Sequence, residues 1–145
     1  MLTDLEIAKE RLFEEDLKIC IVKNKEVIYK SIKRGIYPMY DVVINQFNEL
    51  EGASVADRVV GRAAALLNVY SKVAAVYSEV ISENALELLN ENKIEVFYDT
   101  SVSGIQNREK NDACPIEKIS SKVKDYEYTA LLLKIKEFLI DIKAI

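Results

Sequence analysis

Apolar residues recur along the chain with two periods, one typical of helices and one of strands. Near the start, Thr3 and Glu6 have the spacing of a capping box, in which each side chain bonds the other residue's backbone N–H. Two polar residues, Asn24 and Lys25, separate two β-branched runs and predict a tight hairpin. In chain order, the elements predicted here are a helix ending near Glu15, strands 17–23 and 26–29, and a helix from Pro38 to about Asn48.

The centre of the chain, residues 52–98, is typical of a helix–strand–helix–strand unit. Ser54 can cap a helix that has Asp57 at its third position and runs to about Leu67, and Ser82 can cap a second helix. Strand–helix–strand of this length predicts a right-handed crossover between parallel strands. In such sheets, ligands bind at the carboxyl ends of the strands. The predicted elements are helix 54–71, strand 74–81, helix 83–92 and strand 94–98, which place Ser82, Glu83, Asn84, Ser54 and Asp57 at that edge.

The last third of the chain changes character. Residues 99–112 are polar and lack a helical period, which predicts a surface loop or a short strand at 102–105. Cys114 and Pro115 open a short helix, and residues 126–145 form a strongly periodic amphipathic helix. We therefore expect one α/β domain spanning 1–145, with a mixed sheet of about five strands and with 126–145 as an added C-terminal helix.

Composition narrows the classes of function. The 145 residues are 50% hydrophobic and 30% charged, and the net charge is −4. Binding to a nucleic-acid backbone needs a basic face, so we expect no nucleic-acid partner. The sequence has no run of about eighteen apolar residues, so we expect no membrane span. The acidic start and the two cysteines, Cys20 and Cys114, fit a protein of the reducing cytoplasm.

Three segments carry a resemblance to a known family. The segments VADRVVGRAAALL, VYSEVISENALELL and NDACPIEKI are similar to an uncharacterised prokaryotic family with a cytidine-deaminase-like fold. The resemblance covers roughly residues 2–119 and implies a three-layer α/β/α sandwich. It implies no particular reaction, because the family has no established activity.

Comparison with zinc-dependent deaminases excludes their chemistry. Those enzymes hold zinc with His or Cys at one helix start and with a Pro-Cys-x-x-Cys motif at the next, and a Glu moves the protons. Aligned with that pattern, the ligand positions here become Val55, Ser82 and Ala85, which supply no usable set of zinc ligands. The chain contains no His. We therefore expect no zinc and no other resident cofactor, with magnesium entering only together with a phosphate ligand.

Two groups of polar residues have both a structural and a functional interpretation. Asp57, Arg58 and Arg62 can be a helix cap with two solvated arginines, or a proton-transfer carboxylate with two arginines that bind an anion. Ser82, Glu83 and Asn84 can be an N-cap or the rim of a pocket whose free amides bind an anion or a base edge.

Cys114 is the most reactive-looking side chain, because it lies at a helix start. Glu117 adds negative charge nearby, and the absence of His rules out a Cys–His pair. Cys114 is therefore either a packed thiol that lines the ligand or a reactive one.

The function predicted from these features is a zinc-free, deaminase-like domain that binds a small phosphate-containing or nucleotide-like ligand. One alternative is an enzyme of unknown reaction that uses Asp57 and Cys114. Another is a structural or oligomerisation domain with a vestigial pocket. The apolar stripe from Tyr128 to Ile142 also predicts a homo-oligomer.

Overall fold

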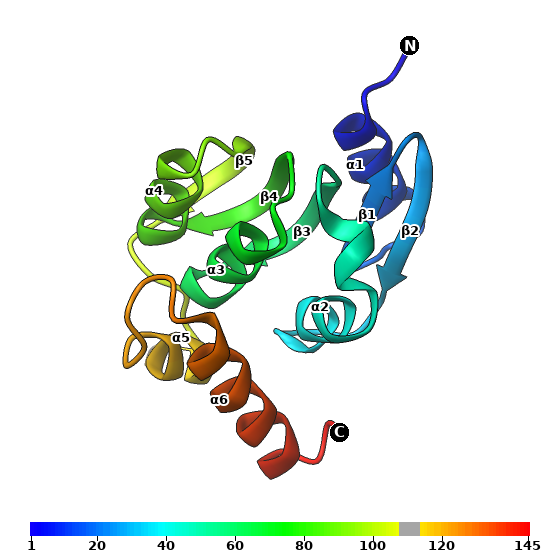
Figure 1. The fold of residues 1–145 in the computed structure, drawn as a ribbon. Helices are drawn as coiled ribbons and strands as arrows, with labels where there is room; N and C mark the ends of the chain where they lie inside the picture. The colour runs from blue at the N-terminus through cyan, green and yellow to red at the C-terminus, as the bar shows by residue number, and fades with distance from the viewer. Residues whose placement is uncertain (108–113) are drawn as a thin grey trace.

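A mixed sheet of five strands forms the centre of the computed structural model, which describes residues 1–107 and 114–145 (Figure 1). β1 runs antiparallel to both of its neighbours, whereas β3, β4 and β5 are parallel to one another. The predicted hairpin, crossover and α/β class are thereby confirmed. The strands lie in the order β2 (Glu26–Ser31), β1 (Ile19–Lys23), β3 (Ser54–Val60), β4 (Ala75–Ser82) and β5 (Glu95–Val102).

Helices cover the two faces of the sheet unequally. On one face, α1 (Asp4–Glu14) packs against β1, β3 and β4, where Leu12 and Tyr77 belong to a small buried cluster. The opposite face carries the larger cluster. That cluster takes buried side chains from α2 (Tyr37–Leu50), α3 (Arg62–Ser71), α4 (Glu83–Glu91) and α6 (Tyr128–Asp141), and the short α5 (Pro115–Ser120) packs against α3 and α6.

Two helix starts follow the predicted capping chemistry. Thr3 Oγ1 accepts a hydrogen bond from the Glu6 backbone N–H at 3.1 Å, and Glu6 Oε1 accepts one from the Thr3 N–H at 2.9 Å. Ser82 Oγ accepts from the Ala85 N–H at 3.1 Å, which caps α4. These bonds satisfy amide groups that have no partner within the helix. Both predicted caps are therefore confirmed.

The predicted helix from Ser54 is wrong in its first half, because residues 54–60 form β3. Val55, Val59 and Val60 fit a helical stripe by spacing, yet their β-branched side chains favour an extended backbone. The strand ends at Val60, Gly61 is the N-cap, and α3 begins at Arg62. Ser54 consequently lies beside Ala75 at the amino end of the parallel strands, instead of capping a helix.

The C-terminal helix packs against its own domain. The buried side chains of α6 are Leu131, Ile135 and Leu139, which lie in the same cluster as α2 and α3. The outer residues Leu133 and Ile140 are 57% and 50% exposed. Most of the apolar stripe is thus used within one chain, and self-association stays a prediction. Among the described residues, no helix has the length and apolar character needed to cross a membrane.

Candidate functional site

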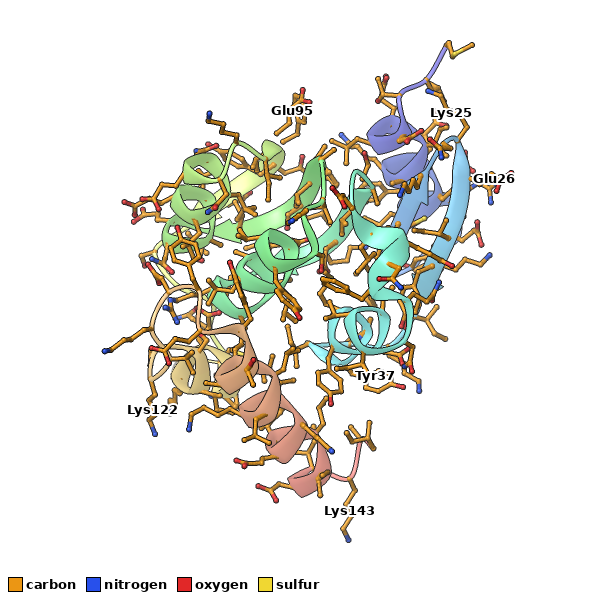
Figure 2. The ribbon with its side chains drawn as sticks, viewed as in Figure 1. Lys25, Glu26, Tyr37, Glu95, Lys122 and Lys143 are labelled. Atoms are coloured by element: carbon orange, nitrogen blue, oxygen red, sulfur yellow. The ribbon has the colours of Figure 1, made fainter. Side chains whose placement is uncertain are left out.

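A cavity of about 690 Å³ opens at the edge of the sheet where β3 ends and β1 begins. Because β1 is antiparallel to β3, Ile19 lies beside Asp57. The β2–α2 connection, α5 and the C-terminal part of α6 complete the wall. Tyr37, the first residue of α2, lies at this edge on the side that faces α6 (Figure 2). The cavity lies at the carboxyl end of β3, where parallel sheets place their ligands, and its volume suits a small molecule.

Asp57 occupies the floor of this cavity. It lies within β3, between Ile19 of β1 and Ser78 of β4. Burial raises the pKa of Asp57 to about 7, and backbone N–H groups of Val59 and Arg58 oppose that rise only in part. Within residues 1–107 and 114–145, no Lys or Arg forms an ion pair with this carboxylate. A partly buried acid without a counter-charge is typical of a functional site.

The strands are distorted beside Asp57. Val55 and Val60 are five positions apart yet belong to the same buried cluster, so the alternation of side chains shifts by one residue between them. Val76 and Ile81 show the same shift in β4. Ser78 Oγ donates a hydrogen bond to the Val80 carbonyl at 2.8 Å at this point. Irregularities of this kind re-aim side chains and are common beside active sites.

Arg58 extends to the opposite face of the sheet. Its Nε donates to the Leu17 carbonyl at 2.9 Å, and one terminal nitrogen donates to the Leu12 carbonyl at 3.0 Å. The other lies 2.6 Å from Glu79 Oε1, and the guanidinium stacks over the Phe13 ring. Arg58 therefore attaches α1 to the sheet. The predicted helix from Ser54 would have carried both Arg58 and Arg62; instead Arg58 belongs to β3 and Arg62 to α3.

Arg62 and Glu117 join α3 to α5. Arg62 donates to the carbonyls of Ser120 and Val123 and to Asp125 Oδ1, the last at 2.6 Å. Its own backbone N–H donates to Glu117 Oε1 at 2.9 Å, so the carboxylate of Glu117 caps α3. Burial raises the pKa of Glu117, which the Arg62 N–H and charge oppose. The anion position at the start of α3 is occupied by a side chain of the protein.

The other predicted ligand residues lie away from the cavity. Ser54 is buried at the amino end of β3, on the opposite end of the strands. Ser82, Glu83 and Asn84 form the start of α4, and none of them lines the cavity wall. The expectation that helix starts at Ser54 and Ser82 bound the pocket is therefore wrong. The starts of α3 and α5 bound it instead.

Cys114 lines the same cavity as Asp57. It is a partly exposed free thiol directly before α5, and its backbone N–H donates to the Ile105 carbonyl at 2.9 Å. Residues 108–113, which include the start of the NDACPIEKI segment, lie outside the described part of the chain. The cavity thus combines a thiol with two carboxylates, those of Asp57 and Glu117.

Sequence reasoning missed the cations of this site. Lys18, Lys33 and Arg34 line the cavity from the start of β1 and from the β2–α2 connection. Lys33 Nζ lies 4.6 Å from the centre of the Tyr37 ring. Among the described residues, none forms an ion pair with Lys18, Lys33 or Arg34. One sequence signal could have found them. Lys33, Arg34 and Gly35 follow β2, and β2 ends at the same edge of the sheet as β3 because β1 is antiparallel to both.

The acidic and thiol groups do not form a metal centre. In the ranges 1–107 and 114–145, no group of three or more His, Cys, Asp or Glu side chains has an arrangement that could hold a metal ion. The cavity wall instead combines the carboxylates of Asp57 and Glu117, the cations of Lys18, Lys33 and Arg34, and the thiol of Cys114. It can bind a small molecule with an anionic group, and it can exchange a proton through Asp57 near neutral pH.

A second depression at the amino end of the strands is a weaker candidate. It is lined by Phe47, Tyr70 and Tyr128, whose rings stack on one another, with centroid distances of 4.8 Å and 4.7 Å. Since these ring faces already contact each other, fewer of them remain for a ligand.

Comparison with known proteins places the chain in a family. The model of a domain of unknown function, DUF1893, matches residues 7–139 and so includes most of α6. The crystal structure of a DUF1893 family protein, TM1506 from Thermotoga maritima, superposes with a TM-score of 0.80 at 26% identity, over 89% of this chain and 86% of that chain. No curated protein matches the sequence. The chain therefore belongs to the DUF1893 family, which confirms the resemblance to an uncharacterised family.

Proposed function

We propose that this chain is a zinc-free domain of the cytidine-deaminase-like fold that binds a small phosphate-containing, nucleotide-like molecule. The cavity at the end of β3 is the observation that carries this proposal. Its volume is within the usual range for ligand sites, and its wall is mainly apolar with a few polar groups. That combination suits a ligand with one flat, weakly polar part and one charged part.

Lys33 and Arg34 are the groups proposed to hold the phosphate. Both are exposed at the cavity rim and belong to one short connection. Guanidinium and ammonium groups are the usual protein partners of phosphate oxygens. They replace Arg58 and Arg62 in this role, because the guanidinium groups of those two residues hold α1 and the α5–α6 connection.

A thermal-shift screen tests the proposal. The purified protein is heated with nucleotides and nucleotide sugars, each with and without magnesium, and bound species are sought by mass spectrometry of the undenatured protein. A ligand at a hundred times its dissociation constant stabilises the fold by about 2.7 kcal/mol. Absence of any shift and of any bound species contradicts the proposal and favours a vestigial pocket.

A pair of charge-matched variants locates the phosphate. Lys33→Ala with Arg34→Ala removes two cations from the rim. Lys122→Ala with Lys124→Ala removes two exposed cations from the α5–α6 connection, and Lys122 lies on a different flank of the molecule from Tyr37 (Figure 2). We expect the first pair to weaken binding by at least about tenfold, since charged hydrogen bonds contribute 1.5–3 kcal/mol. Equal weakening by both pairs indicates a general charge effect only.

An enzyme that uses Asp57 and Cys114 is the second candidate, because both side chains line the same cavity. The wild type, Asp57→Asn and Cys114→Ser are incubated with each ligand that binds, and the ligand is then weighed by mass spectrometry. A change in ligand mass that depends on both side chains favours an enzyme. An unchanged ligand favours a binding domain.

A further inference from the structure

We propose that Asp57 selects the ligand of this cavity, and that the ligand class is a guanine nucleotide with its N–H edge on Asp57 and its phosphate at the rim. This inference rests on the proposed function and gives it a substrate class. It follows from two features of the described residues: the charged groups that line the cavity, and the acceptor capacity of Asp57.

The charges around the cavity come from different elements. Lys33 and Arg34 belong to the β2–α2 connection, whereas Glu117 belongs to α5 on the side of α3. Asp57 lies in β3, between Ile19 of β1 and Ser78 of β4, and lines the same cavity. Apolar side chains also line the cavity, among them Met39, Ala64, Ile116 and Leu139. A matching ligand has an anionic end and, at its other end, a flat ring whose faces contact apolar side chains and whose edge carries hydrogen-bond donors.

Asp57 has unused acceptor capacity. An ionised carboxylate accepts about four hydrogen bonds, and the backbone N–H groups of Val59 and Arg58 favour the charged form of Asp57. Within residues 1–107 and 114–145, no side chain donates a hydrogen bond to the Asp57 carboxylate, so a ligand in the cavity can use its remaining lone pairs. An unpaired carboxylate in this position costs stability, whereas an apolar residue would extend the core beside Ile19. A ligand that donates hydrogen bonds to Asp57 would explain why an acid occupies this position.

Guanine supplies them in the geometry that a carboxylate prefers. Its ring N1–H and its 2-amino group are adjacent parallel donors, which can bond the two oxygens of one carboxylate as an Arg guanidinium does. Hypoxanthine keeps the N1–H but lacks the amino group. Adenine turns an acceptor nitrogen toward the carboxylate, which repels it when Asp57 is ionised, above its pKa of about 7. Sites built for such donors discriminate strongly against analogues that lack them.

Titration calorimetry with GMP, IMP and AMP at pH 8.5, where Asp57 is ionised, tests the inference on the full chain. We expect wild-type protein to bind GMP at least about tenfold more tightly than AMP, with IMP between them. Asp57→Asn replaces one acceptor oxygen with a donor, so the GMP-to-AMP preference should fall below about threefold. Asp141→Asn, an exposed acid on α6, is the matched control and should keep the wild-type preference.

The outcomes separate this inference from the proposed function. If GMP and AMP bind equally well, Asp57 does not select the ligand. If the Lys33→Ala, Arg34→Ala variant then weakens binding of both, the proposed phosphate site still holds. A GMP preference that survives Asp57→Asn also overturns the inference. Failure of every nucleotide to bind overturns both. Loss of folding does not confuse the test, because the neutral side chain of Asn removes a buried charge and should stabilise the protein.

Discussion

The carboxylate of Glu117 lies against Gly61, at the start of α3, in the position that a side chain on residue 61 would occupy. Gly61 has φ −100° and ψ −170°, an extended backbone that any residue can adopt. Glycine is required here only by the close approach of Glu117. The two residues, far apart in sequence, therefore form one structural unit that fixes α5 on the cavity wall.

This contact predicts a non-additive pair of substitutions. Gly61→Ala should push the Glu117 carboxylate off the Arg62 N–H, and Glu117→Ala should remove the same cap. Each is expected to cost about 1–2 kcal/mol in unfolding free energy. Because both abolish one interaction, the double variant should cost little more than either single variant. Urea denaturation measures all four proteins, and simple additivity would contradict the contact.

Arg58 should contribute to stability through α1. Arg58→Ala removes bonds to Leu17 and Leu12 and leaves Glu79 without its partner. We expect a loss of about 2–4 kcal/mol in urea denaturation. Glu79→Gln should cost less, because Glu79 is 36% exposed and water replaces the lost charge interaction. If Arg58→Ala lowers the unfolding free energy by less than Glu79→Gln does, the contacts of Arg58 with α1 contribute little to stability.

Asp57 should make stability depend on pH in a defined window. Its pKa is raised to about 7 in the folded chain, against about 4 in the unfolded chain. Folding therefore takes up a proton between pH 4 and 7, and the wild type loses stability as pH rises through that window. Three pKa units correspond to an upper bound of about 4 kcal/mol.

The measurement compares wild type with Asp57→Asn by urea denaturation at pH 4, 6 and 8. The variant should match the wild type near pH 4 and exceed it increasingly up to pH 8. Glu117, whose pKa is also raised, is present in both proteins and cancels in the difference. A difference that stays flat from pH 4 to 8 would mean that Asp57 is not desolvated.

Local signals account for what the sequence could predict. Thr3 with Glu6, and Ser82 with Ala85, are close in sequence, so spacing alone identified both caps. At residues 54–60 the same reasoning gave the wrong element. The apolar spacing fits a helix, but pairing with β1 and β4 stabilises these residues as the strand β3. Tertiary pairing of this kind overrides local pattern.

The candidate site shows the same limit more strongly. Cys114 and Asp57 were singled out by residue type, and the structure brings them to one cavity. The contacts that position the site, between Arg62 and Glu117 or Asp125, join residues more than fifty positions apart. No periodicity encodes such pairs. The rim cations Lys33 and Arg34 were passed over because their connection is assigned to this edge only by the sheet order.

The inner and outer faces of α6 should respond differently to truncation of one side chain. Ile135 is fully buried against α2 and α3, whereas Leu133 is 57% exposed. Ile135→Ala should cost about 2–4 kcal/mol in unfolding free energy, and Leu133→Ala less than about 0.5 kcal/mol. Equal small effects would show that α6 is an appendage rather than part of the core.

The rate of thiol labelling at Cys114, with Cys20 as the buried reference, should report whether a ligand occupies the cavity. Cys20 is fully buried, and burial raises its pKa to about 11, so its thiol is neutral and inaccessible in the folded chain. Cys114 is partly exposed and lines the cavity. Iodoacetamide at pH 8 should therefore add one label per native chain, and a second only after unfolding.

A ligand in the cavity should slow this labelling. Saturating GMP is expected to reduce the rate at Cys114 several-fold, while the labelling of Cys20 in unfolded protein should be unchanged. Cys114→Ser should abolish the native label, which confirms the assignment by mass spectrometry of the peptides. Rapid native labelling of Cys20 would contradict the packing of α1 on the sheet. Labelling of Cys114 that is unaffected by a nucleotide shown to bind would place that nucleotide outside this cavity, because a ligand beside Asp57 must cover the thiol or block its approach.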